Sequence, residues 1–423
     1  MTKEGVEPTT VVPRSKRLGL FEAYGVEIEM MIVDTETLDV KPICDQLIAA
    51  VAGESVSEVE LGDVAWSNEL TLHVLEMKTN GPAPSLAGLA ARFHENVLRA
   101  SEKLEPLGAR LLSGAMHPWM DPDAETELWP HEYTEVYHTF DRIFGCSGHG
   151  WANLQSTHVN LPFSGDEEFA RLHAAVRLVL PLVPALAASS PFRDGRIGPA
   201  LDSRLAAYRE NARRIPSVAG HVVPEAVFSR AQYEEEILGR LYADLAPHDP
   251  EGVLRYEWAN ARGAIARFDR GTIEIRLIDS QECPAADLAV VAAVVSLVRS
   301  LAVGRLSGRD VRDDPSTESL ARLLDAAIRE GERAVAEERG LLAALGVRSD
   351  RVALGELWAR LLDADPPEDP TDEWTGPLEA IVRHGPLARR LLGAAGAEPE
   401  RNDLRRVVAE LGRCLDANET FVA

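Results

Sequence analysis

Short stretches of the first 280 residues alternate between hydrophobic and polar positions, as half-buried β-strands do. The clearest is "GVEIEMMIV", residues 25–33, whose even-numbered positions are all apolar and share one face. The odd-numbered positions form the other face, which carries Glu27 and Glu29. Met31 and Val33 continue that face, so it is partly covered, and two parallel carboxylates on it require an explanation.

The same pattern extends over most of the chain. Helical spacing dominates from residue 285 onward, whereas strands and helices are interspersed before it. This order indicates an α+β fold with a largely antiparallel sheet. The predicted strands cover residues 25–33, 55–61, 70–79, 109–119, 151–163 and 270–283, and the helices before residue 285 cover 43–53, 86–108 and 166–189.

Charge and hydropathy narrow the classes of partner. A net charge of −24 over 423 residues argues against nucleic acid and anionic membranes. The apolar run 288–303 comes closest to a membrane span, but Arg299 and its modest length favour a buried helix. The N-terminal residues lack the apolar core of a signal peptide, so we expect a cytoplasmic protein. Chain length and the apolar helix are compatible with a homo-oligomer.

Basic residues restrict the ways in which the protein could handle phosphate. Only five lysines are present, none beyond Lys103, against 39 arginines. The sequence has no G-x-x-x-x-G-K-[ST] motif, which excludes a P-loop. Phosphate would therefore have to be bound by arginines and metal ions.

Cysteine and tryptophan give weaker indications. The four cysteines have no CxxC spacing, which indicates neither a zinc site nor a disulfide framework. Cys146 would need a base such as His149 to act as a nucleophile, and a structural role in a loop is the simpler interpretation. Trp119, Trp129 and Trp151 either line a substrate pocket or pack in the core.

Polar side chains interrupt three further predicted strands at positions where a core would be apolar. Glu69 lies seven positions before Glu76, so in an unbroken strand the two would face opposite ways. Glu69 could join the others only from a strand end, across a β-bulge or from a loop. The interrupting residues are Glu76 on 70–79, His158 and Asn160 on 151–163, and Glu274 and Arg276 on 270–283.

Each of these motifs has an ordinary explanation, and only their combination is informative. An E-x-E strand is usually a solvated face, a single strand histidine is usually structural, and an E-x-R pair usually forms a cross-strand ion pair. Several buried carboxylates together are costly unless cations neutralise them, and lysines are too few nearby to do so. Carboxylates with one imidazole suit Mg²⁺ or Mn²⁺, which commonly bridge the phosphates of ATP.

Several blocks together resemble the glutamate–cysteine ligase family, in particular the bacterial carboxylate–amine ligases of its second group. The resemblance runs from about residue 20 to about residue 300, in matching order and separation. The blocks are "GVEIEMMIVD", "ELTLHVLEMKTNGP", "LQSTHVNLPF", "ALAASSPF" followed by "SRLAAYR", and "GTIEIRLIDSQ". The segment 120–150 is longer and more aromatic than the usual family pattern.

The resemblance implies a curved, mostly antiparallel sheet of the glutamine synthetase and glutamate–cysteine ligase type, with flanking helices and with ATP and Mg²⁺ or Mn²⁺ on its concave side. Arg276 would approach the nucleotide phosphates, and Arg209 the transferred phosphoryl group or the acceptor carboxylate. Asn160, Arg204 and Tyr208 would contribute to substrate or phosphate binding. The implied metal ligands are Glu27, Glu29, Glu69, Glu76, His158 and Glu274.

The resemblance also implies a reaction and a domain organisation. ATP would convert a substrate carboxylate, such as that of glutamate, into an acyl phosphate, and an amine would then displace phosphate to give a γ-glutamyl amide. Substrates would be small molecules. We expect a flexible arm over residues 1–17, the catalytic domain over 18–305 and a helical region packed on it over 306–423.

Three other interpretations compete with this one. A metallohydrolase could use His149 and His158 with neighbouring acids, although an acid-rich, histidine-poor site favours hard-metal ATP chemistry. A phosphotransferase on a related sheet would need the same metals and arginines without ligation. A non-catalytic homologue would retain the sheet without the chemistry.

Overall fold

The computed structural model describes residues 17–306, 315–367 and 372–422, so the predicted arm, apart from Arg17, lies outside the described residues. Its centre is an eight-stranded sheet of order β2-β3-β4-β1-β6-β10-β9, with β5 also paired to β1. Every pairing in this sheet is antiparallel, which confirms the α+β prediction. Its strands are β1 (Gly25–Asp34), β2 (Glu58–Leu61), β3 (Val64–Asn68), β4 (Val74–Thr79), β5 (Ala109–Leu112), β6 (Ser156–Pro162), β9 (Ala264–Arg267) and β10 (Thr272–Asp279).

Two strands of the eight-stranded sheet were not predicted from the sequence. β3 and β9 contain only buried residues, so neither shows the alternation that reveals a half-buried strand. The strand predicted over 70–79 begins only at Val74, because residues 69–73 form the connection from β3. The prediction that only helices follow residue 285 was wrong in one detail, since β11 (Val335–Ala336) and β12 (Val352–Ala353) form a small antiparallel pair.

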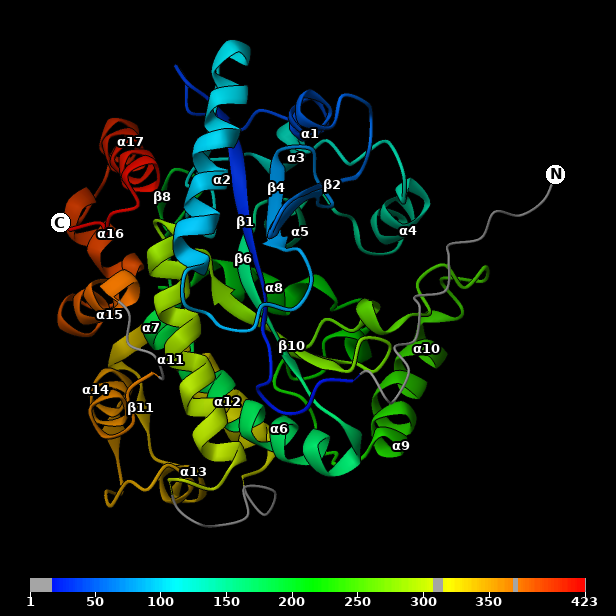
Figure 1. Ribbon diagram of the computed structural model, residues 1–423, viewed down its shortest axis with the longest axis vertical. Coiled ribbons are helices and arrows are strands. Elements are labelled where there is room, and N and C mark those ends of the chain that lie inside the picture. The colour runs from blue at the N-terminus through cyan, green and yellow to red at the C-terminus, as the bar shows by residue number, and fades with distance from the viewer. Residues whose placement is uncertain (1–16, 307–314, 368–371, 423) are drawn as a thin grey trace.

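Helices cover one face of the sheet. The apolar even-numbered residues of β1 belong to the main hydrophobic cluster, together with Phe93 of α2, Phe169 of α6 and Val291 of α11. Figure 1 shows α2, α6 and α11 lying along this face. The helices before residue 303 are α1 (Cys44–Ala52), α2 (Leu89–Leu104), α3 (Pro122–Glu125), α4 (Thr134–Phe144), α5 (His149–Ala152), α6 (Gly165–Val179), α7 (Pro184–Ala187), α8 (Ser203–Asn211), α9 (Arg230–Tyr233), α10 (Arg240–Leu245) and α11 (Pro284–Ala302).

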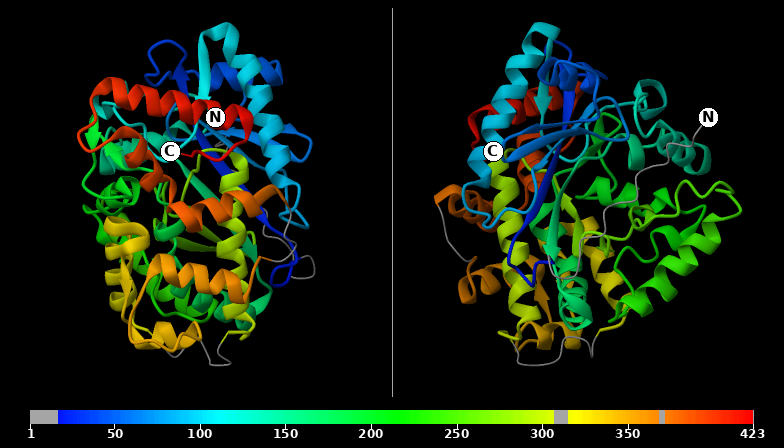
Figure 2. Two further views of the ribbon diagram at one scale, coloured as in Figure 1. Left: turned by 90° about the vertical axis from the view of Figure 1, so that its left-hand side faces the viewer. Right: turned by 45° about the vertical axis from the view of Figure 1, so that its right-hand side comes forward.

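The opposite face is covered over only part of its length. Met31 and Val33 pack in a second cluster with Leu391 of α16 (Leu387–Ala395) and Val407 of α17 (Arg401–Ala417). The end of β1 that carries Glu27 and Glu29 lies beyond this cover. Figure 2 shows α9 and α10 projecting on the side of the sheet away from α2 and α11. The face of the sheet that carries Glu27 and Glu29 is therefore bordered by separate segments and is not covered by a layer of helices.

The most apolar helix, α11, is long and hydrophobic enough to cross a membrane by composition alone. In the folded chain, 89% of its apolar stretch is buried, as the sequence predicted, so α11 is a core helix. Leu320, Leu357 and Ile381 from later helices join the same cluster. The boundary at 305 stays a prediction. The later helices are α12 (Thr317–Glu330), α13 (Arg339–Ala344), α14 (Leu354–Ala364), α15 (Asp372–His384), α16 (Leu387–Ala395) and α17 (Arg401–Ala417), and a further strand pair is β7 (Phe192–Arg193) with β8 (Arg196–Ile197).

Candidate active site

Strand register brings the predicted polar positions face to face. In the adjacent strands β4, β1, β6 and β10, Glu29 pairs with Glu76 and Glu27 with His158. Farther along, Asn160 pairs with Glu274. Directly opposed residues on one face have side chains only about 5 Å apart, so these pairings gather the charges at one place.

The gathered residues line a cavity of about 620 Å³. Its walls come from β1, β2, β3, β4, β6, β9 and β10, with Glu69 and residues 80–82 among the connections. Glu29 lies beneath the floor and is only 5% exposed. The predicted residues that line the cavity are Glu27, Glu69, Glu76, His158, Asn160, Glu274 and Arg276.

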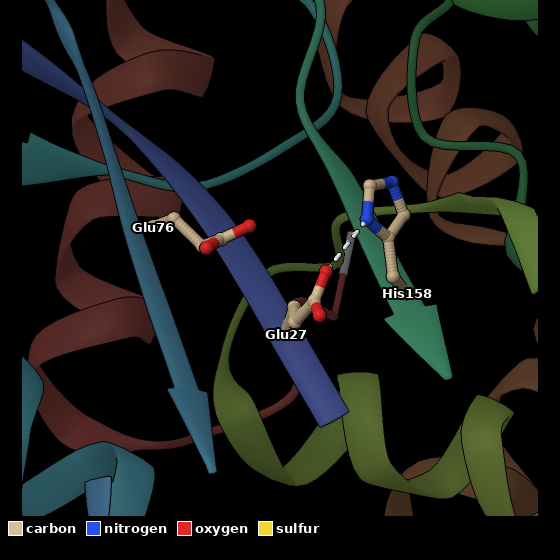
Figure 3. A group of neighbouring side chains, drawn as sticks. All are labelled: Glu27, Glu76 and His158. Carbon is tan, nitrogen blue, oxygen red and sulfur yellow. Dashed lines mark hydrogen bonds and ion pairs between the residues drawn. The ribbon is translucent and has the colours of Figure 1, made fainter. Parts of the chain in front are cut away.

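Two overlapping clusters have a spacing that could hold metal ions. The first contains Glu27, Glu76 and His158, and the second contains Glu29, Glu69 and Glu76. Within each cluster one ligand atom per residue lies within 4.8 Å of the others. Figure 3 shows the first cluster, with its side chains converging from β1, β4 and β6. Glu76 belongs to both clusters.

Glu69 reaches the second cluster from a loop. It follows the last residue of β3 and precedes β4, so the alternation of an unbroken strand does not apply to it. The loop route is therefore the one that the structure uses, among the three that the sequence left open.

Hydrogen bonds fix the centre of the site. His158 Nδ1 lies 3.1 Å from Glu27 Oε2, and its Nε2 lies 2.8 Å from Ser156 Oγ. The backbone N–H of Ser156 donates to Glu29 Oε2 at 2.7 Å. Burial opposes the charged forms, but the contact between them raises the pKa of His158 and lowers that of Glu27.

The other carboxylates are less well compensated. Burial, with Glu76 and Glu29 nearby, raises the pKa of Glu69 well above its ordinary value. Burial and the charge of Glu27 likewise raise the pKa of Glu76. Crowded, buried carboxylate oxygens of this kind are stabilised by a hard divalent cation, and one imidazole is compatible with it. The residues present therefore fit Mg²⁺ or Mn²⁺.

Arginines dominate the β9–β10 end of the cavity. Arg276 Nε donates to Glu274 Oε1 at 2.5 Å, and Arg267 Nη1 lies 3.5 Å from Glu274 Oε2. Despite its burial, the neighbouring arginines lower the pKa of Glu274 to about 2. Arg270 lines the same end. Arg267 was not identified from the sequence, because β9 itself was not predicted, and Arg270, in the turn between β9 and β10, was not singled out either.

A lysine in the cavity was also missed. The sequence predicted too few lysines to neutralise the carboxylates and did not single out Lys78 of β4, which lies 3.4 Å from Glu76 Oε1 and 2.7 Å from Glu58 Oε2. Lys78 lies two positions after Glu76 in "EMK", so the two side chains share a face of the strand, and this spacing could have identified it. Burial acts against its charge, but Glu76 and Glu58 raise the pKa of Lys78.

Three residues of α8 have different positions from those expected. Arg204 is buried, and its Nε donates to Asp279, so it supports the end of β10 from behind. Tyr208 donates to the backbone oxygen of Ala261 at 2.9 Å. Arg209 does not join the cavity; its Nη1 pairs with Asp325 of α12 at 2.7 Å. None of the three is among the described residues that line the cavity.

The remaining candidates lie elsewhere. His149 Nε2 contacts Asp194 at 2.8 Å, away from His158. Cys146 is buried, which raises the pKa of its thiol to about 12 and suits a structural role. The described cavity lining contains no tryptophan. Trp119 instead donates to Asp39, at 2.7 Å.

Comparison with known proteins identifies the family of this chain. Residues 23–410 match the family model for glutamate-cysteine ligase family 2. The chain belongs to this family. Its members are ligases, so the protein is an ATP-dependent enzyme that joins a carboxylate to an amine.

Relatives support the assignment at moderate similarity. An "Uncharacterized protein" of Archaeoglobus fulgidus is 30% identical over 398 residues, which is 94% of this chain and 100% of that protein. A "Putative glutamate--cysteine ligase 2-3" of Rubrobacter xylanophilus is 33% identical over 195 residues. That second alignment covers 46% of this chain and 49% of the relative, so this chain spans about half the length of that ligase relative.

A solved structure shares the fold. It is the glutamate–cysteine ligase of Francisella tularensis in complex with AMP, with a TM-score of 0.58 and 11% sequence identity. The match covers 93% of this chain and 89% of that one. This confirms the predicted ligase-type sheet.

Proposed function

We propose that this family 2 ligase activates a small carboxylate, with glutamate the first candidate, as an acyl phosphate and transfers it to an amine. The observation that carries the proposal is the pair of carboxylate clusters sharing Glu76, beside the arginines of β9–β10. ATP and free amino acids meet in the cytoplasm, where we expect the enzyme to act on its small-molecule substrates.

The charge distribution of the cavity suits this reaction. A carboxylate is a poor electrophile, and its attack on the γ-phosphate of ATP brings two anions together. Mg²⁺ or Mn²⁺ held by the two clusters would supply the charge neutralisation that this encounter requires. Arginines at the opposite end of the cavity add fixed positive charge for the phosphate oxygens.

Individual residues have distinct proposed roles. Glu27, Glu76 and His158 would hold one ion, and Glu29 and Glu69 would join Glu76 around a second. Glu274 holds the Arg276 guanidinium by a charged hydrogen bond, which leaves the planar fork oriented for phosphate. Glu274 pairs with Arg267 and Arg276, so in this arrangement it would orient Arg276 and is also a candidate metal ligand.

Turnover with a panel of amines tests the proposal. The protein is incubated with ATP, Mg²⁺ and glutamate, while ADP, phosphate and product mass are followed. The double variant Glu27→Gln with Glu29→Gln should lose metal-dependent ADP release by about 100-fold or more, because both clusters lose charge. Its fold should remain intact by circular dichroism.

The exposed carboxylate of Glu60 on β2 provides a matched control, and Glu60→Gln should retain activity. Full activity in the double variant would refute the proposed site. A phosphorylated acid without an amide product would instead identify a phosphotransferase.

A further inference from the structure

Lys78 occupies an unusual position for a cation in a site built to bind metal. Its backbone pairs directly with Glu27 of β1, and its ammonium lies between two carboxylates. One is Glu76, the residue shared by both clusters. The other is Glu58 on the edge strand β2, whose side chain is 48% exposed. Among the described residues that line the cavity, Lys78 is the only lysine.

The positive charges of the cavity are arranged unequally around its carboxylates. Arg267 and Arg276 contact Glu274 at the β10 end, and neither has an ion pair with Glu76. Glu76 Oε1 instead accepts a hydrogen bond from Ser67 at 2.7 Å and faces Lys78. Lys78 is thus the cation that acts on the shared ligand, and a metal ion bound there would compete with it for the same carboxylate.

We propose that Lys78 is a positioning residue. Its ammonium neutralises Glu76 in the metal-free protein and pairs with Glu58 instead when a divalent ion binds to Glu76. The ammonium is compact and its stem is flexible, so a shift from one carboxylate to the other needs no backbone movement. Glu58 is exposed and already makes the shorter of the two contacts with Lys78, so it is placed to keep the ammonium when a metal ion occupies Glu76. This inference rests on the proposed metal-binding function.

The affinity for a metal ion, measured without nucleotide, distinguishes the roles of the two carboxylates that contact Lys78. Mn²⁺ is titrated into the full chain by calorimetry. Lys78→Met should bind Mn²⁺ about three- to tenfold more tightly, because a competing positive charge is gone. Glu58→Gln should bind it several-fold more weakly, because the ammonium then remains on Glu76.

A double variant separates this coupling from simple loss of charge. In the Lys78→Met background, the effect of Glu58→Gln should largely disappear, whereas a purely additive field effect would leave it unchanged. Lys78→Arg, which keeps the charge, should stay within about twofold of the parent protein. Unaltered or weaker Mn²⁺ binding by a folded Lys78→Met protein, or full additivity, would overturn the inference.

Parallel titration of Glu76→Gln identifies which hypothesis has failed. If the parent protein binds no Mn²⁺, the proposed function itself fails. The other outcome is that the parent protein binds Mn²⁺, with binding weakened by Glu76→Gln but not strengthened by Lys78→Met. In that case only the proposed role of Lys78 is wrong.

Discussion

Histidine shows how the surroundings of a single residue decide its chemistry in this protein. His158 and His173 are both largely buried. Burial lowers the pKa of His173 to about 3, since its neighbours are the rings of Phe169 and Tyr233 and the guanidinium of Arg177. The pKa of His158 is raised instead, because carboxylates surround it. One imidazole is a packing group and the other belongs to the candidate site.

The low pKa of His173 predicts a defined loss of stability in acid. The unfolded chain takes up this proton near pH 6.5, whereas the folded chain does not until about pH 3. Stability is therefore lost as the pH falls through this interval. Between about pH 6 and 4, the unfolding free energy of the parent protein relative to His173→Phe should fall by about 1.4 kcal/mol per pH unit.

Urea unfolding at pH 6, 5 and 4 measures this difference. His138→Gln, at an exposed position of α4, serves as the control and should show no such slope. A constant difference between the parent protein and His173→Phe would contradict the assignment.

At the scale of an element, α4 connects the aromatic segment 120–150 to the candidate site. Tyr137 of α4 accepts a hydrogen bond from Asn68 Nδ2 at 2.9 Å, directly beside Glu69. Burial and the charge of Glu69 raise the pKa of the Tyr137 phenol, so its oxygen stays protonated. The segment 120–150, which is longer and more aromatic than the usual family pattern, thus borders the Glu29–Glu69–Glu76 cluster.

Tyr137→Phe should loosen α4 without unfolding the protein. A hydrogen bond of this kind contributes about 0.5–1.5 kcal/mol, so local opening should increase about two- to tenfold. Amide hydrogen exchange in residues 134–144 measures it, with α2 as the internal reference. Unchanged exchange in α4 would show that other contacts hold the helix in place.

At the scale of the whole molecule, a buried ion pair joins the chain end to the sheet. Arg390 Nη1 of α16 lies 2.6 Å from Glu282 Oε1, and both side chains are almost fully buried. Arg390 also donates to the backbone oxygen of Phe421, whose N–H donates to Glu282 at 3.1 Å. These hydrogen bonds therefore attach the last described residues to the turn between β10 and α11.

Removing one partner of this pair leaves a buried charge without compensation. Arg390→Met should lower the unfolding free energy by about 3–5 kcal/mol. The exposed pair of Arg413 and Glu410 offers a matched comparison, and Arg413→Met should lower the unfolding free energy far less, because water solvates both charges. Denaturant unfolding of both variants tests this, and similar losses in the two would contradict it.

The sequence by itself determined which side chains share a face. Alternation along β1, β6 and β10 is local, so the facing of Glu27 with Glu29, of His158 with Asn160 and of Glu274 with Arg276 followed from position alone. Family resemblance added the expectation that these faces meet. The apolar length of α11 likewise predicted its burial.

Only the tertiary structure decided which of these residues become neighbours. Register depends on contacts between distant segments, and it placed Glu27 opposite both His158 and Lys78. Fully buried strands such as β9 carry no alternation, so Arg267 remained hidden. A helix can present a residue to either side, which is why Arg209 could be expected in the site and yet pairs with Asp325. Local periodicity determines which face of its own element a side chain occupies, whereas packing between elements determines which residues that side chain contacts.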